Sequence, residues 1–156
     1  MRSRVRSKLN RREFTLGLAA GLGLAAHPGG ASAQETPPAW EQAVKAILGE
    51  AKPIDGKLVL DLPEIAENGN TVPFTVSVES PMSEADHVKA LHVLATANPQ
   101  PGVATFRFSL LSGKASVASR MRLARTQDVI AIAELSEGRF MMSKRNVKVT
   151  IGGCGG

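Results

Sequence analysis

The only cysteine of the chain lies in its last six residues, which read "IGGCGG". Two glycines precede Cys154, Gly152 and Gly153, and two follow it, Gly155 and Gly156. A thiol placed there has no side chain beside it in sequence against which to pack. Glycine lacks a Cβ and samples φ/ψ space freely. Residues 152–156 are therefore predicted to form a flexible arm, slim enough to carry a thiol into a narrow channel of another protein.

The residues around Cys154 in the sequence indicate that its thiol is exposed to other proteins and that its own chain does not lower the thiol pKa. No Lys, Arg or His lies within five positions of Cys154, and the terminal carboxylate is only two residues away. Catalytic cysteines depend on nearby cations, or on a base held by rigid neighbours. We therefore expect a partner protein to activate Cys154.

Three interpretations of the tail stay open on these grounds. It is a frayed terminus with a chance cysteine, a disulfide tether to another chain, or an arm that carries a covalent substrate. A prenylation signal is excluded, because such a signal needs three residues after the cysteine and only two follow. The terminal Gly-Gly also resembles that of ubiquitin-like sulfur carriers, whose C-terminal carboxylate is adenylated by ATP. An exported protein would not encounter ATP, so this interpretation is weak.

The rest of the sequence offers no catalytic constellation. His87 and His92 are five positions apart, in or beside one strand, and are expected on opposite faces. No cluster of cysteines or carboxylates accompanies them, so the sequence predicts no metal site. No glycine-rich phosphate loop opens a helix. We therefore expect no catalytic residue and no cofactor, which favours a carrier or interaction protein over an enzyme.

Residues 1–33 have the character of an export signal. Six basic residues precede the apolar "FTLGLAAGLGLAA", and "ASA" supplies a small-residue cleavage pattern. Arg11 and Arg12, in "NRREFTL", resemble the twin-arginine signature. The alternative is an ordinary Sec signal. The stretch is too short and too rich in glycine to span a bilayer stably. The expected location is the periplasm, without membrane attachment once the signal is removed.

Removal of this leader changes the charge of the protein. The leader holds six of the 19 Lys and Arg residues and one of the 14 Asp and Glu residues, which leaves 13 of each. The mature chain is thus formally neutral, and the basic character of the full sequence belongs to its leader. A nucleic-acid partner is not supported, because such partners need a basic surface.

Residues 34–52 are predicted to contain a short amphipathic helix. Pro37 and Pro38 precede it, and Gly49 and Pro53 follow it. Its apolar residues recur at helical spacing and form one stripe: Trp40, Ala43, Val44, Ile47 and Leu48. We expect this stripe to pack against the body of the protein.

Residues 53–151 change to a period of two. Apolar residues alternate with polar ones in runs such as "KLVLDL", "FTVSVES", "TFRFSL" and "VASRMRL", with turn signals between the runs. Together with "HVKALHVLA", "DVIAIAEL" and "RFMMSKRNVKVTI", about seven strands are predicted. The expected fold is all-β, an immunoglobulin-like antiparallel β-sandwich.

Two of these runs depart from the pattern of one apolar and one polar face. In "DVIAIAEL", Ile130 and Ile132 oppose Val129, Ala131 and Ala133. Either the strand is central and covered on both sides by its own chain, or a partner chain covers one face. In the last run, the apolar parity changes between residues 140–142 and 147–151, which predicts a β-bulge near residues 143–146.

Several long segments resemble the SoxY family of the periplasmic Sox system for thiosulfate oxidation. They are "AENGNTVPFTVSVESPMSEADHVKALHV", "NPQPGVATFRFSLLSG", "RLARTQDVIAIAELSEG" and "VKVTIGGCGG", besides the leader. The terminal motif is the most specific of them. The resemblance covers nearly the whole chain and implies an immunoglobulin-like sandwich that forms a heterodimer with SoxZ.

The resemblance also implies a role for Cys154, as the covalent anchor for sulfur intermediates. The haem protein SoxXA would couple thiosulfate to the thiol as a cysteine S-thiosulfonate, and SoxB would release sulfate by hydrolysis. Where SoxCD is present, it would oxidise the remaining sulfane sulfur. The chain itself would be a carrier, not an enzyme. The rival interpretation is an exported structural module whose tail cysteine forms an intermolecular disulfide.

Overall fold

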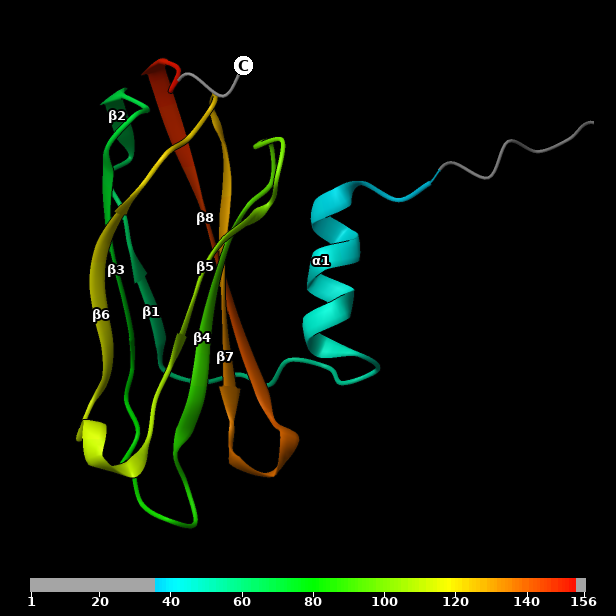
Figure 1. Cartoon of the computed structure of the whole chain (residues 1–156), viewed down its shortest axis with the longest axis vertical. Helices are drawn as coiled ribbons and strands as arrows, with labels where there is room; N and C mark the ends of the chain where they lie inside the picture. The colour runs from blue at the N-terminus through cyan, green and yellow to red at the C-terminus, as the bar shows by residue number, and fades with distance from the viewer. Residues whose placement is uncertain (1–35, 154–156) are drawn as a thin grey trace, which may run out of the picture. The chain divides into compact units, whose positions relative to one another are not determined.

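The computed structural model describes residues 36–153, which form a β-sandwich with one helix beside it (Figure 1). The described part contains one α-helix, eight strands and two short 3₁₀ turns. In chain order they are α1 (Ala39–Leu48), β1 (Leu58–Asp61), β2 (Ile65–Asn68), β3 (Val72–Val78), β4 (Val88–Ala95), β5 (Gly102–Arg107), η1 (Leu110–Ser112), β6 (Ala115–Met121), β7 (Gln127–Leu135), η2 (Ser136–Gly138) and β8 (Phe140–Ile151).

The strands form two sheets that enclose the main core. One sheet has the order β1-β3-β6 and the other has the order β2-β8-β7-β4-β5. Alternation in β3 buries Phe74, Val76 and Val78, as its sequence predicts. From the other sheet, Leu91 and Val93 of β4 reach the same core. The predicted all-β sandwich with a short helix is confirmed.

The strand that the sequence analysis missed is β2. It is only four residues long and is followed directly by a turn at Gly69 and Asn70, so it is too short to show a clear alternation. It pairs with β8 in parallel, with Ile65 opposite Lys148 and Asn68 opposite Ile151. The sandwich therefore has eight strands and is not wholly antiparallel.

Helix α1 covers the outer face of the five-stranded sheet. Its apolar stripe packs on a second cluster, made by Leu94, Ile130 and Ile132, with Phe140 beside them. Ile130 is 2% exposed and Ile132 is fully buried. Both apolar faces of β7 are thus covered within the chain, one by the core and one by α1. The interpretation that a partner covers one face of this strand is wrong.

The predicted bulge in the last strand is also wrong. β7 and β8 keep one antiparallel register from Gln127 opposite Val147 to Glu134 opposite Phe140. The apolar residues change from one face of β8 to the other along its length because α1 covers one face near its start and the main core covers the opposite face near its end. Phe140 faces α1 at the start of β8, whereas Val147 faces the main core near its end.

The leader lies outside the described residues, and with it Arg11 and Arg12. Among residues 36–153, no helix is long and apolar enough to cross a membrane.

Candidate functional site at the end of β8

Strand β8 delivers the C-terminal glycines to one end of the sandwich. Gly152 and Gly153 follow its last residue, Ile151, and are the final described residues. Cys154, Gly155 and Gly156 lie outside the described part of the chain. The site is therefore built from the segment that precedes Cys154, where β8 ends beside β2 and the connection from β6 to β7 (Figure 1).

Backbone hydrogen bonds tie this segment to two other parts of the chain. The N–H of Gly153 donates to the carbonyl oxygen of Leu123 over 2.9 Å, and the N–H of Leu123 donates to the carbonyl oxygen of Gly69 over 2.8 Å. The N–H of Gly69 in turn donates to the carbonyl oxygen of Ile151 over 2.8 Å. The end of β8, the turn after β2 and the loop after β6 are thus joined in one closed network.

Three glycines at this end of the sandwich, two of them in the network, approach other backbone atoms too closely to carry a side chain. A Cβ on Gly153 would lie 2.7 Å from the carbonyl oxygen of Gly69, and a Cβ on Gly69 would lie 2.6 Å from the nitrogen of Gly153. A Cβ on Gly152 would overlap the carbonyl oxygen of Ala124. None of the three has a φ in the left-handed region, so space and not conformation requires glycine here.

Gly153 is also buried, although the chain ends only three residues later. The sequence analysis assigned flexibility to Gly152 and Gly153, and that role stays a prediction. What the structure adds is a second requirement at the same two positions, namely close contact with the backbone of residues 69, 123 and 124.

Two polar side chains hold the loop that accepts Gly153. Gln127 is 4% exposed; its Oε1 accepts the N–H of Ala97 over 2.7 Å, and its Nε2 donates to Asn98 Oδ1 over 2.9 Å. Asn98 Oδ1 also accepts the N–H of Ala124 over 3.0 Å, while its Nδ2 donates to the carbonyl oxygen of Arg122 over 2.9 Å. The backbone on both sides of Leu123 is therefore fixed by Asn98.

The same loop carries positive charge. Arg122 and Arg125 flank Leu123 and Ala124, and both side chains are exposed. No carboxylate among residues 36–153 lies within ion-pair distance of either guanidinium. These two arginines, which have no ion-pair partner among the described residues, put positive charge on the loop that contacts Gly153.

The two histidines singled out in the sequence lie apart from this end of the sandwich and do not form a site together. His92 lies on the outer face of β4, where its Nδ1 is 3.0 Å from Thr105 Oγ1 and its Nε2 is 4.0 Å from a Glu134 oxygen. His87 Nδ1 lies 3.0 Å from the carbonyl oxygen of Ser83. In the described part of the chain, no three His, Cys, Asp or Glu side chains gather in a way that could hold a metal ion.

Partial burial shifts the pKa of His92. Desolvation lowers its pKa below the ordinary 6.5; the carboxylate of Glu134 opposes this shift, and the guanidinium of Arg107 adds to it. The neutral imidazole is therefore favoured in the folded protein.

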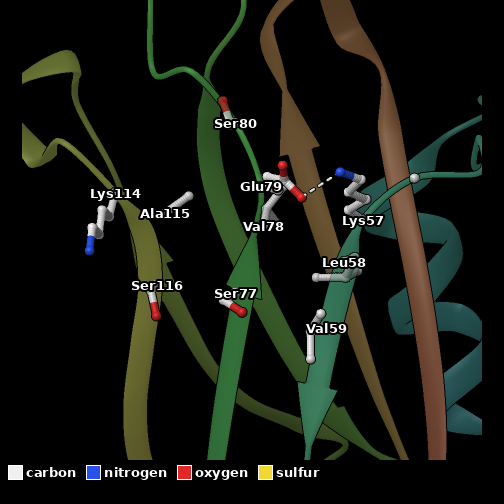
Figure 2. A pocket seen from close by; sticks show the side chains of 11 residues that line it. Lys57, Leu58, Val59, Ser77, Val78, Glu79, Ser80, Lys114, Ala115 and Ser116 are labelled. Carbon is white, nitrogen blue, oxygen red and sulfur yellow. Dashed lines mark ion pairs between the residues drawn. The ribbon is translucent and has the colours of Figure 1, made fainter.

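An open hollow of about 700 Å³ lies at the other end of the three-stranded sheet. Figure 2 shows Ser77 and Val59 on neighbouring strands, and the ion pair between Lys57 and Glu79 at the rim, 2.7 Å long. In the register of β3 with β6, Val78 lies opposite Ala115 at the hollow, and Val72 lies opposite Met121 at the end of the sheet near Gly69. Six strand residues at ~3.3 Å each put the hollow about 20 Å from the segment that leads to Cys154.

Sequence reasoning found Cys154 and its glycines but missed the residues that contact Gly152 and Gly153. Gly69 lies in one of the turns between the alternating runs, and Leu123 is the last residue of the run "VASRMRL". Gln127 gave no signal at all. Their contacts with the chain end join segments far apart in sequence, which neither periodicity nor local composition reports.

Comparison with known proteins places the chain in one family. A family model described as "Sulfur oxidation protein SoxY" matches residues 44–154. The sulfur carrier protein SoxY from Chlorobium limicola f thiosulfatophilum is similar in structure, with a TM-score of 0.56 and 28% sequence identity. That match covers 69% of this chain and 89% of the other.

Superoxide reductases share the fold at lower identity. The neelaredoxin from Ignicoccus hospitalis has a TM-score of 0.54 at 15% identity, and covers 60% of this chain and 80% of its own. A superoxide reductase described as putative, from Thermotoga maritima, has a TM-score of 0.52 at 18% identity, with 63% and 92% covered. These likenesses concern the fold alone. No curated protein matches the chain in sequence.

Proposed function

Because the chain belongs to the SoxY family of sulfur oxidation proteins, we propose that it carries sulfur intermediates as covalent adducts of the Cys154 thiol. The observation that carries the proposal is the extent of the family match, which ends on Cys154 itself. Cys154 is the only cysteine of the chain, so no other thiol competes for the role.

The proposed loading step is an oxidation. The Cys154 S–H bond breaks, and its sulfur bonds to the outer sulfur of thiosulfate, giving Cys–S–S–SO₃⁻, one proton and two electrons. A haem protein of the SoxXA type accepts the electrons. Hydrolysis by an enzyme of the SoxB type then adds water at the sulfonate sulfur, which releases hydrogen sulfate and leaves a Cys154 persulfide.

The surroundings of the arm suit this chemistry. Thiosulfate and its adduct are both anions, and the exposed Arg122 and Arg125 put positive charge on the loop that contacts Gly153. A carrier does not need its own catalytic base, because each partner enzyme supplies the activation. In the proposed cycle the chain is a substrate carrier in the periplasm and holds no cofactor of its own.

The partners belong to the same proposal. SoxZ would form the heterodimer, SoxXA and SoxB would bind the arm in turn, and SoxCD would follow where the organism has it. Since α1 already covers Ile130 and Ile132, we expect the proposed interface with SoxZ to lie on another surface of the protein.

The deciding experiment is intact-mass spectrometry of the mature protein with SoxZ, after incubation with thiosulfate and SoxXA. We expect an added mass of one thiosulfate group, removed by reductant and mapped to the C-terminal peptide. Cys154→Ser keeps the shape but removes the thiol, so this variant should fold, bind SoxZ and gain no mass. Thiosulfate oxidation at the wild-type rate by Cys154→Ser would contradict the proposal, and a disulfide dimer as the sole product would favour the structural module.

A further inference from the structure

We propose that Gly152 and Gly153, the two glycines before Cys154, are held in a rigid anchor and do not supply the flexibility that the sequence predicts for residues 152–156. The anchor consists of Gly69, Leu123, Ala124, Gly152 and Gly153. In this view the freedom that the sequence assigns to residues 152–156 does not extend to 152 and 153. The anchor stands on contacts in the described structure, and only its effect on sulfur transfer rests on the proposed function.

The first argument is the closed hydrogen-bond network. Gly153 donates to Leu123, Leu123 donates to Gly69, and Gly69 donates to Ile151 at the end of β8. A freely moving arm would leave these groups to water. Here each bond closes a path between segments that are far apart in sequence, so the loss of one bond loosens the others.

The second argument is the absence of room for a side chain. Flexibility alone would be served by glycine in open space, as at Gly102, where an added Cβ would meet nothing within 4 Å. At Gly153 the added Cβ would lie 2.7 Å from the oxygen and 2.9 Å from the carbon of the Gly69 carbonyl. Backbone atoms cannot swing aside as the end of a flexible side chain can, so the contact must break.

The third argument is the support behind the anchor. The loop that holds Gly153 is itself held by Asn98, which binds backbone groups of Arg122 and Ala124. Gln127, buried beneath the loop, binds Asn98. A rigid acceptor fixes the position of its donor, and Gly153 is the donor directly before Cys154.

A fixed origin changes what the arm can do. If Gly153 is fixed, the thiol of the next residue can be presented only at this end of the sandwich, which raises its effective concentration there. Less conformational entropy is also lost when a partner channel takes it up. Partner enzymes must then approach the end of the sandwich where the β2–β3 turn and the β6–β7 loop lie.

Hydrogen exchange tests the anchor without any sulfur chemistry. The amide of Gly153 is followed by NMR in the mature wild-type protein. We expect exchange slower than in an unfolded chain by about tenfold or more, because the N–H is bonded to Leu123. Exchange at the unfolded-chain rate would overturn the anchor, whatever Cys154 carries.

A double-mutant cycle tests whether the distant glycines act as one unit. Gly69→Ala and Gly153→Ala should each lower the midpoint of thermal unfolding and speed exchange of the Leu123 amide. The double variant should add little to either, since both changes break the same contact. Gly102→Ala is the matched control and should leave both readouts at their wild-type values. Simple additivity of the two changes would contradict the anchor.

Transfer kinetics test the positioning role. Gly69→Ala should slow loading by SoxXA several-fold, while alkylation of Cys154 by iodoacetamide stays within about twofold of wild type. Unchanged loading in a variant whose position 153 amide exchanges freely would overturn the positioning role. If wild type itself gains no adduct, the proposed function fails, and the exchange result still stands by itself.

Discussion

The N–H of Gly153 lies 2.9 Å from the carbonyl oxygen of Leu123, and this bond joins the last described residue to the loop between β6 and β7. The same Leu123 donates its own N–H to Gly69 over 2.8 Å. The place where the C-terminal glycines leave the sandwich is therefore set by residues from two distant parts of the chain.

The side chain beneath that loop should contribute to stability. Gln127→Met keeps the length of the side chain but leaves the N–H of Ala97 and one oxygen of Asn98 with fewer partners. We expect a loss of about 1–3 kcal/mol in the free energy of unfolding, the usual cost of buried polar groups left unsatisfied. Urea unfolding measures it. Gln100→Met, at an exposed position, is the control; equal losses in the two variants would refute the role of Gln127.

The packing of α1 against the five-stranded sheet gives a second prediction. Ile132 is fully buried between α1 and the sheet, so Ile132→Ala should lower the free energy of unfolding by about 2–5 kcal/mol. Ile65→Ala, at a position that is 59% exposed, should cost far less. Denaturant titration followed by the fluorescence of Trp40, which packs in the same cluster, reports both. A near-zero effect at Ile132 would show that α1 does not cover this face in solution.

The stability of the protein should fall as the pH drops below 6.5, in part through His92. Burial lowers the pKa of His92 in the folded state, while Glu134 opposes the shift and Arg107 adds to it. Between the folded and unfolded pKa values the unfolded chain binds more protons, so the free energy of unfolding decreases as the pH decreases through this window. His92→Gln should flatten the dependence between pH 7.5 and 5, measured by thermal unfolding at each pH. An unchanged slope would assign the effect to other groups.

Export should depend on the paired arginines of the leader. Arg11→Lys together with Arg12→Lys keeps the charge and removes the twin-arginine signature. The precursor is then expected to stay in the cytoplasm, as measured by fractionation and immunoblotting. Undiminished periplasmic protein would indicate the Sec route. A matched variant, Arg4→Lys with Arg6→Lys, should be exported normally.

The alternation of side chains made much of the sandwich predictable. In β3 every second residue is apolar and faces the core, because successive side chains on a strand point to opposite faces. The stripe from Trp40 to Leu48 predicted α1 on the same kind of local rule. Such patterns depend only on residues near in sequence, so they could be seen without coordinates.

What covers each face was decided by the tertiary structure. The sequence left two explanations for Ile130 and Ile132, and only the packing shows that α1 of the same chain covers them. The change of face between Phe140 and Val147 likewise suggested a bulge. In the structure β8 keeps one register with β7, and α1 and the main core cover its two faces.

The candidate site divides in the same way. The sequence alone determined that one cysteine, Cys154, stands among four glycines at the end of the chain. Only the tertiary structure placed Gly153 against Gly69 and Leu123, because backbone contacts between distant segments leave no periodic signal. A glycine needed for flexibility and a glycine needed for space are the same letter in the sequence, and only their neighbours in the fold distinguish them.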